Sequence, residues 1–372
     1  MMSEKKIVFG TWEVVAVLIT MISTKCIMYF PRTMAEDSGT AGWIEALFIS
    51  VMAFIVFVLI SRLYSPFEGK DLIDIGEYIG GSAGRIITGL ILLAFLLFLV
   101  PLVFREFGEQ MKALGFVNTP ISFILFFFAS GMIVAAYFGL EAIVRFQSIA
   151  VTVIVICYVI YILLLWPRYD ITQLTPVLGT GIKDIFGRGF FRLSEYAELL
   201  LLFMIMPFIK TGRNFRTAGY VAIGLNAFFL LTVTLANLLA ISYPTTVENT
   251  IPVYVLGRLI VYGRFFQRIE SLFVTTWSLV GLMYLSTGFY FILHIFKKVF
   301  RLEYTRPLIW PFIILIFNLS LFPSNIKRTI ELEVNYFRNW AWIVAFALPI
   351  LILFVARAER AKREKRNTEG TR

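Results

Sequence analysis

The sequence has very little cysteine and histidine. Its 372 residues include only two cysteines, Cys26 and Cys157, which lie inside apolar runs, and one histidine, His294. These numbers exclude a disulfide framework and a zinc site built on cysteine. The sequence also has no phosphate-binding loop, no G-x-S-x-G motif and no cluster of metal-ligating residues. We therefore expect neither an enzyme nor a bound cofactor or metal.

Charged residues are scarce as well. They make up 16% of the chain, whereas about 25% is usual for a soluble domain, and 59% of the residues are hydrophobic. Apolar runs such as 86–104 and 149–166 approach the roughly 20 residues that cross a bilayer. The sequence therefore predicts an all-α polytopic membrane protein. It excludes a soluble enzyme, a nucleic-acid-binding domain and a single-span receptor with a large ectodomain.

About ten apolar segments are long enough to span a membrane. Their approximate ranges are 8–30, 40–62, 86–108, 120–138, 146–166, 190–210, 217–243, 268–296, 307–323 and 337–356. No hydrophilic stretch is long enough for a separate domain, so residues 1–356 are expected to form one transmembrane domain. Residues 357–372 form a basic tail. Because a basic block beside a span favours the cytoplasmic side, both termini are predicted to lie in the cytoplasm.

Two spans at corresponding positions of the chain are interrupted. In the first span, residues 23–26 (Ser-Thr-Lys-Cys) break the apolar run, and Pro31 follows it. The sixth span begins with the polar, glycine-containing segment 187–198 before a wholly apolar stretch. Interrupted spans at matching positions of two halves are typical of transporters that bind substrate at broken helices. We therefore expect a five-plus-five inverted repeat with broken helices 1 and 6, although the sequence itself shows no repeat.

Lys25 is the most unusual charge, because a lysine in the middle of a span costs about 2.5–3.5 kcal/mol on insertion scales. One interpretation is that it faces the interior of the bundle, where it contacts a ligand carboxylate or replaces a transported cation. The other is that its long side chain extends to the outer surface of the membrane. The sequence leaves both alternatives open.

Two carboxylates in the sixth span, Glu195 and Glu198, are three residues apart and share a face if the segment is helical. Glu198 lies deeper in the span, so we expect it to bind a ligand ammonium group or the unwound backbone of the first span. Glu195 is expected to lie at the outer surface, paired with Arg188 or Arg192.

Charged residues at two other span ends are expected to form structural ion pairs. Arg105 and Glu109 are four residues apart at the end of the third span, and Arg268 and Glu270 open the eighth. Residues four apart, such as Arg105 and Glu109, lie close together on a helix. For both sets a structural role is favoured over a binding site.

Several short motifs, in this order and spacing, resemble a known family. They are Phe30-Pro31-Arg32, Gly42-Trp43-Ile44, the segment from Arg105 to Glu109 with Thr119-Pro120, the segment from Pro176 to Gly179 with Gly181, Glu198 followed by Pro207, and the segment from Arg268 to Ser271 with Trp277. Over nearly its whole length the chain resembles the B subunits of spore germinant receptors. These are endospore germination permeases of the amino acid–polyamine–organocation superfamily.

The resemblance implies ten helices in a five-plus-five inverted repeat, with a small nutrient germinant, often an amino acid, bound between spans one, three, six and eight. The predicted ligand-binding residues are Ser23, Thr24, Lys25, Cys26, Leu99, Tyr196, Glu198 and Met283. The resemblance also implies an A-type subunit and a C-type lipoprotein subunit as partners. It implies the spore inner membrane as the location.

The chain departs from the family pattern in the first span, which usually carries small residues, commonly glycines, at its break. Here Thr24, Lys25 and Cys26 occupy that region, and the bulky Met283 and Tyr284 lie in span eight. The pocket is therefore filled, takes a differently charged molecule, or binds nothing in this subunit alone. Besides a sensor, the sequence allows a secondary amino acid transporter coupled to H⁺ or Na⁺, or a structural membrane subunit.

Overall fold

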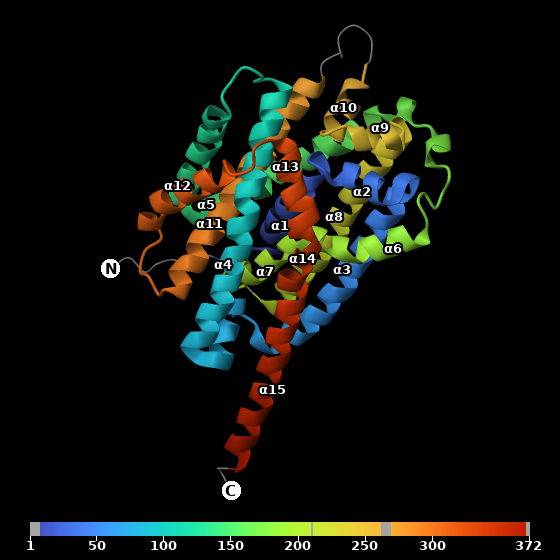
Figure 1. Cartoon of the computed structure of the whole chain (residues 1–372). Coiled ribbons are helices and arrows are strands. Elements are labelled where there is room, and N and C mark those ends of the chain that lie inside the picture. Colours follow the sequence, from blue (N-terminus) through green and yellow to red (C-terminus); the bar gives the residue numbers. More distant parts are fainter. Residues whose placement is uncertain (1–7, 210, 262–268, 370–372) are drawn as a thin grey trace.

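Helices form where the apolar runs lie between glycine and proline breakers, and the result is a bundle of helices (Figure 1). The computed structural model describes residues 8–209, 211–261 and 269–369. Over these ranges the one β-type contact is an isolated bridge between Phe9 and Ile209. The fold of the described chain is therefore all-α, as the sequence predicts.

The α-helices follow one another along the chain as α1 (Thr11–Ile27), α2 (Phe30–Ser38), α3 (Gly42–Tyr64), α4 (Leu72–Leu114), α5 (Ile121–Leu164), α6 (Ile182–Phe191), α7 (Leu200–Ile205), α8 (Gly212–Ala240), α9 (Tyr243–Glu248), α10 (Pro252–Arg258), α11 (Ile269–Val299), α12 (Ile309–Ser320), α13 (Ile326–Ile330), α14 (Arg338–Trp342) and α15 (Leu348–Glu369). The 3₁₀ segments are η1 (Gly39–Ala41), η2 (Ser65–Phe67), η3 (Trp166–Arg168), η4 (Ile171–Leu174), η5 (Arg192–Leu199), η6 (Met206–Phe208) and η7 (Arg306–Leu308). Two π-helical segments, η8 (Glu331–Phe337) and η9 (Ile343–Ala347), interrupt the last long helix.

Six helical segments of the described chain are long and apolar enough to cross a membrane. They are Phe30–Phe67, Leu72–Leu114, Ile121–Arg168, Gly212–Ala240, Val274–Val299 and Ile326–Lys365. The chain is thus a multi-pass integral membrane protein. The number of ten spans and the inverted repeat stay predictions.

The first span is broken, but not where the sequence indicates. Residues 23–26 belong to α1, which continues to Ile27, and the helical geometry is lost at Met28 (φ −94°, ψ −106°). The helix resumes as α2, with Pro31 in its first turn, where proline is well tolerated. The prediction was wrong by a few residues because polar side chains interrupt the hydropathy pattern without interrupting the hydrogen bonds of a helix.

The centre of the bundle is α1. Every residue from Val14 to Ile22 is buried, and α1 packs against α8, α5 and α11. A helix that is apolar on all sides is stable only when other helices surround it. At its start, the Phe9 N–H donates to the Phe208 carbonyl at 2.7 Å, which joins the beginning of the first span to the end of the sixth.

The long helix α4 contains a hairpin near its start. Gly81 has φ 59° and ψ −143°, which breaks the helix, and the backbone then turns back on itself so that Gly76 and Gly84 lie in contact. Only glycine readily adopts this left-handed backbone, and only residues without Cβ allow the two arms to lie so close. The segment 72–80 therefore packs directly on the helix that follows.

Replacing Gly84 by alanine is expected to destabilise the protein by about 1–3 kcal/mol, because the added Cβ meets the Gly76 carbonyl. The matched control is Gly80→Ala, four residues away in the same hairpin, where a Cβ meets no atom within 4 Å. This control is expected to leave stability unchanged or slightly raised. Thermal unfolding of the purified variants measures both. Equal behaviour of the two variants would contradict the close contact.

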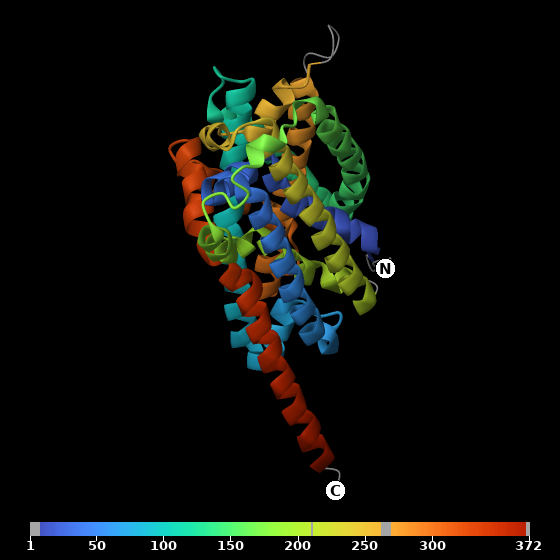
Figure 2. The ribbon, with the colours of Figure 1, turned by 90° about the vertical axis from the view of Figure 1, so that its right-hand side faces the viewer.

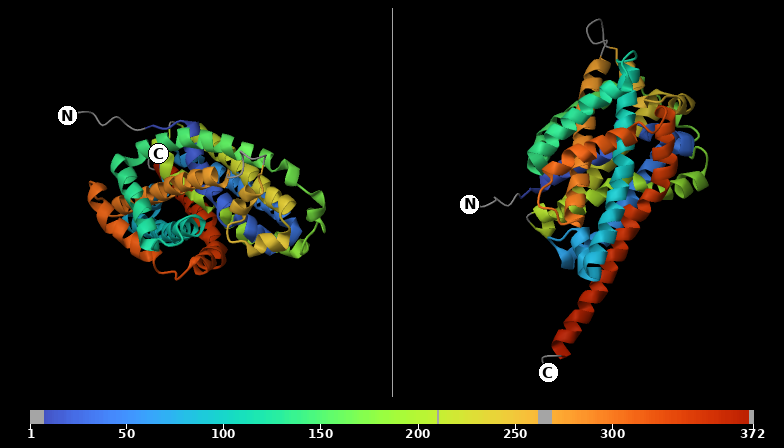
Figure 3. Two further views of the ribbon diagram at one scale, coloured as in Figure 1. Left: turned by 90° about the horizontal axis from the view of Figure 1, so that it is seen from above. Right: turned by 60° about the vertical axis from the view of Figure 1, so that its left-hand side comes forward.

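The C-terminal segment from α13 to α15 lies beside α4, and α15 then extends beyond the other helices (Figure 2; Figure 3, right). Arg357 donates to the Arg62 and Leu63 carbonyls at the end of α3, at 2.5 and 3.1 Å. Arg363 donates to the Tyr78 carbonyl of the α4 hairpin at 3.2 Å. The described part of the basic tail, up to Glu369, is therefore a helix whose first two turns are attached to the ends of α3 and the hairpin.

Candidate functional site

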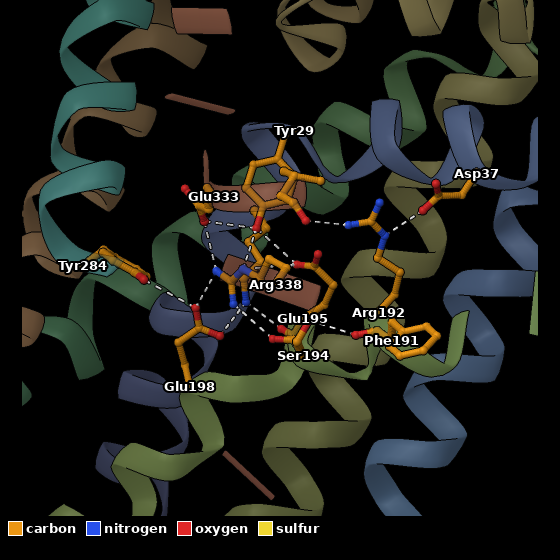
Figure 4. Close-up of polar contacts among 12 residues, drawn as sticks. Tyr29, Asp37, Phe191, Arg192, Ser194, Glu195, Glu198, Tyr284, Glu333 and Arg338 are labelled. Atoms are coloured by element: carbon orange, nitrogen blue, oxygen red, sulfur yellow. Dashed lines mark hydrogen bonds and ion pairs between the residues drawn. The ribbon is translucent and has the colours of Figure 1, made fainter. Parts of the chain in front are cut away.

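A cluster of buried charged side chains lies where the break of the first span meets the sixth. Its centre is Arg338 of α14, which is fully buried (0% exposed) (Figure 4). One terminal nitrogen donates to Glu198 Oε1 at 2.9 Å and to Glu333 Oε1 at 3.0 Å. The Nε donates to the Tyr29 hydroxyl at 3.0 Å, and the other terminal nitrogen donates to the Ser194 carbonyl at 3.0 Å. Every nitrogen of the guanidinium thus has a partner.

Lys25 of α1 completes the cluster from the other side. Its Nζ donates to Glu198 Oε2 at 2.5 Å and to the Glu195 backbone carbonyl, also at 2.5 Å. The side chain is 2% exposed, so it faces the interior of the bundle and does not extend to the outer surface. Glu198 therefore bridges the two buried cations with its two oxygens, and Tyr284 of α11 donates to Oε1 at 3.4 Å.

The backbone of the sixth span explains why these groups meet. Residues 192–199 form the 3₁₀ segment η5, and Tyr196 has non-helical dihedral angles. A 3₁₀ segment between two α-helices leaves carbonyl groups without helical partners, and in a membrane each such group must be satisfied inside the protein. Arg338 and Lys25 supply those hydrogen bonds to Ser194 and Glu195. Cations of the chain itself therefore occupy the unwound segment.

A second ion-pair group connects α2 to the same segment. Arg192 of η5 donates to Asp37 Oδ2 at 2.6 Å and to the Val334 carbonyl at 3.0 Å. Arg188 lies 3.3 Å from the other oxygen of Asp37. The breaks in spans one and six and the π-helical segment η8 are thus linked by buried polar contacts.

The comparisons with known proteins agree with this architecture. Residues 10–329 match the family model described as "Spore germination protein". This chain belongs to that family. Among curated relatives, spore germination protein YndE of Bacillus subtilis (strain 168) is 24% identical over 361 residues, covering 93% of this chain and 96% of the relative. Spore germination protein A2 of the same organism is 23% identical over 368 residues, covering 96% and 99%.

Solved structures with a similar fold are transporters. The nucleobase-cation-symport-1 transporter Mhp1 has a TM-score of 0.68 at 11% identity, covering 87% of this chain and 74% of that one. A Na⁺-coupled sialic acid symporter has a TM-score of 0.67 at 12% identity, covering 93% and 79%. MhsT, solved with L-phenylalanine, has a TM-score of 0.66 at 14% identity, covering 95% and 89%. At these identities the likeness shows a transporter fold in a spore germination protein.

Six of the eight residues that the sequence predicts to bind a ligand fall into two groups in the structure. Lys25 and Glu198 belong to the charged cluster. A cavity of about 80 Å³ between α1, α5, α8 and α11 is lined by four others, namely Ser23, Thr24, Cys26 and Met283. The two groups are neighbours, because Thr24 and Cys26 flank Lys25 in α1. Beside Glu198, in contrast, a cavity of about 10 Å³ has room for one water molecule.

Two predicted ligand residues lie in neither group. The Tyr196 hydroxyl is 2.8 Å from Ser50 Oγ, so this side chain is hydrogen-bonded to α3. Leu99 is part of the hydrophobic core of α4. Both are fully buried and help to hold the helices around the site.

The structure corrects the expectation for Glu195. This side chain is fully buried and accepts a hydrogen bond from the Tyr29 hydroxyl at 3.2 Å, with Arg338 at 4.0 Å. Its expected partners Arg188 and Arg192 pair with Asp37 instead. The 3₁₀ winding of η5 turns Glu195 inward, which helical spacing does not predict.

Of the two ion pairs expected at span ends, the structure describes one. Arg105 and Glu109 form an ion pair at 2.6 Å within α4. For the expected pair at the start of α11, Arg268 and the side chain of Glu270 lie outside the described residues. Sequence reasoning missed Arg338 and Glu333. The need for a second cation besides Lys25 follows only from the structure, where both Glu195 and Glu198 are buried.

Proposed function

We propose that this protein is the membrane subunit of a spore germinant receptor. It binds a small nutrient germinant, an amino acid or a similar molecule, in a transporter-like pocket and signals germination. It acts without catalysing a reaction, in the spore inner membrane, together with an A-type and a C-type lipoprotein subunit. The observation that carries the proposal is the bridge that Glu198 makes between Lys25 and Arg338 at the unwound η5.

This bridge suggests how a ligand acts. In a transporter fold, unwound backbone at broken helices binds the charged ends of a small substrate near the middle of the membrane. In this chain Lys25 occupies one side of Glu198, so an incoming ammonium group competes with Lys25 for the carboxylate. When the ligand displaces Lys25, α1 loses its bond to η5, and the cavity beside Thr24 and Cys26 receives the rest of the molecule. The ligand then favours a conformation in which α1 is released, which is the differential affinity that a switch requires.

A binding and uptake experiment tests the proposal. The purified protein is reconstituted in proteoliposomes and offered a panel of radiolabelled amino acids, with and without gradients of Na⁺ and H⁺. We expect saturable binding and no concentrative uptake, because Lys25 supplies a fixed positive charge and makes a coupled cation unnecessary. Replacing Na⁺ by K⁺ is expected to leave the binding affinity unchanged.

The second candidate, a secondary amino acid transporter coupled to H⁺ or Na⁺, is favoured by the fold, which resembles that of a nucleobase–cation symporter and a Na⁺-coupled symporter. Accumulation of the label that collapses when an ion gradient is dissipated would establish the transporter and contradict the sensor. If no amino acid of the panel binds, even in the presence of the A-type and C-type subunits, the protein is a structural subunit of the receptor and the sensor proposal is wrong.

A further inference from the structure

A basic cavity lies away from the charged cluster, between the α4 hairpin and the end of α11. It has a volume of about 350 Å³ and is lined by Glu77, Arg85, His294, Lys297, Lys298, Arg301 and Leu302. Its lining thus contains four cationic side chains and a single carboxylate. Such a concentration of positive charge in a concave site favours an anionic ligand.

The ion pairs around this cavity leave positive charge uncompensated. Arg85 and Arg301 both contact one oxygen of Glu77, at 3.1 and 2.5 Å. One carboxylate therefore serves two guanidinium groups, which keep further donors for another acceptor. Both guanidinium groups are also held in place by this shared partner, so little order is lost when an anion binds between them.

The two lysines of the cavity differ in their surroundings. Lys298 Nζ lies 2.5 Å from Asp71 and 2.6 Å from Asp74, so its charge is balanced. Lys297 is half-buried, and no carboxylate of the described chain lies within 4.0 Å of its ammonium group. With Asp71 and Asp74 included, the cavity still has one positive charge in excess, and Lys297 is the cation without an acidic partner among the described residues.

The end of α11 positions these side chains through an unusual backbone. The Leu302 N–H donates to the Lys297 carbonyl at 2.9 Å and the Arg301 N–H to the Lys298 carbonyl at 3.3 Å, which is a Schellman cap. Arg301 has φ 53°, in the left-handed region where such caps usually have glycine. A strained arginine at this position places its guanidinium on Glu77, at the cavity.

An exposed apolar side chain, Leu302, lines the same cavity, and Phe300 lies two residues earlier in the chain. Phe300 is 50% exposed and Leu302 is 39% exposed, next to the cationic groups in sequence. The basic tail lies at this end too, because Arg363 is 4.4 Å from the ring centroid of Tyr78 in the hairpin. Cationic pockets between helices, on the side of the membrane that holds a basic tail, bind anionic lipid headgroups. The exposed apolar side chains here can contact the acyl chains of the same lipid. A free inorganic anion has no apolar part that would contact those side chains.

We propose that this cavity binds the phosphate group of an anionic phospholipid, with Lys297, Arg301 and Arg85 contacting the phosphate oxygens. The lipid stabilises the contact between the α4 hairpin and α11. This site is separate from the germinant pocket and does not depend on it.

The test uses the full-length protein in nanodiscs of phosphatidylcholine, with a fluorescent phosphatidylglycerol as the titrated probe. Lys297→Gln is expected to weaken phosphatidylglycerol binding about tenfold, the effect of losing one charge-assisted hydrogen bond, and Lys297→Arg is expected to retain it. The matched control is Lys362→Gln, which removes the same charge from an exposed position on the basic tail at the same end. Its binding is expected to stay within about twofold of the parent protein, because an exposed charge is screened by salt.

Three other results would overturn the proposal. One is equal binding by the parent protein and Lys297→Gln, which would mean that Lys297 does not contact the lipid. An equal loss of binding in Lys297→Gln and Lys362→Gln would likewise mean that the lipid responds only to the general surface charge. The third comes from titrating inorganic phosphate in nanodiscs of phosphatidylcholine, with and without added phosphatidylglycerol. If phosphate binds there and Lys297→Gln abolishes this binding while phosphatidylglycerol does not compete, the site takes a free anion and the lipid assignment is wrong.

Discussion

Replacing Arg338 by glutamine is expected to destabilise the folded protein by about 3–5 kcal/mol, the usual cost of removing one partner from a buried ion pair. The guanidinium contacts Glu198 and Glu333 at 2.9 and 3.0 Å, and Glu195 lies 4.0 Å away. All four side chains are at most 1% exposed. Without the arginine, Glu198 keeps only Lys25 as a cationic partner. Thermal unfolding of the purified protein and its yield from membranes measure the loss.

The matched control is Arg328→Gln in α13, ten residues before Arg338 in the chain. Arg328 is exposed and pairs with Glu331 at 2.8 Å, a surface contact whose removal is expected to cost less than about 1 kcal/mol. The double variant Arg338→Gln with Glu333→Gln is expected to recover part of the stability, because it removes one of the uncompensated carboxylates. Equal stability of the Arg338 and Arg328 variants would show that the charged cluster does not support the fold.

The helical fold could be predicted from the sequence because hydropathy is a local property. The apolar run of the third span, predicted over 86–108, lies within α4 (Leu72–Leu114), and the odd start of the sixth span corresponds to the 3₁₀ segment η5. The ends of helices could not be predicted in the same way. Helical hydrogen bonds continue through polar residues. At Gly81 the chain reverses within a single residue, and at Gly139 the helical dihedral angles are lost in a single residue, so no polar loop marks either break.

The site could be predicted only in part. Lys25 and Glu198 are charges inside apolar runs, a signal that a single sequence carries. Arg338 lies near Lys327 and Arg328 at the start of the last predicted span, where loops commonly have basic residues. What distinguishes it is contact with Tyr29 and Glu198, residues that are 309 and 140 positions away in the chain. Only the packing of distant helices brings these groups together.

Replacing Lys25 by methionine is expected to abolish the response to germinant while the protein remains folded in the membrane. The ammonium group joins α1 to η5 through Glu198 and the Glu195 carbonyl, and in the proposed mechanism the ligand breaks this contact. Methionine removes the contact permanently, so the ligand no longer changes the equilibrium between the two conformations. Glu198 keeps its bond to Arg338, so the loss of stability is expected to be smaller than in Arg338→Gln. The germination dose–response of spores that carry the variant, with quantified protein levels, measures the effect.

A matched control separates loss of the switch from loss of a buried ion pair. Arg105→Met also replaces a buried cation by methionine and leaves Glu109 of α4 without its partner. This variant is expected to lower the amount of protein without moving the germinant concentration of half-maximal response. Lys25→Arg preserves the charge and is expected to retain a response. An unchanged dose–response in Lys25→Met would show that the Lys25–Glu198 contact is structural, and the germinant would then have to act elsewhere in the protein.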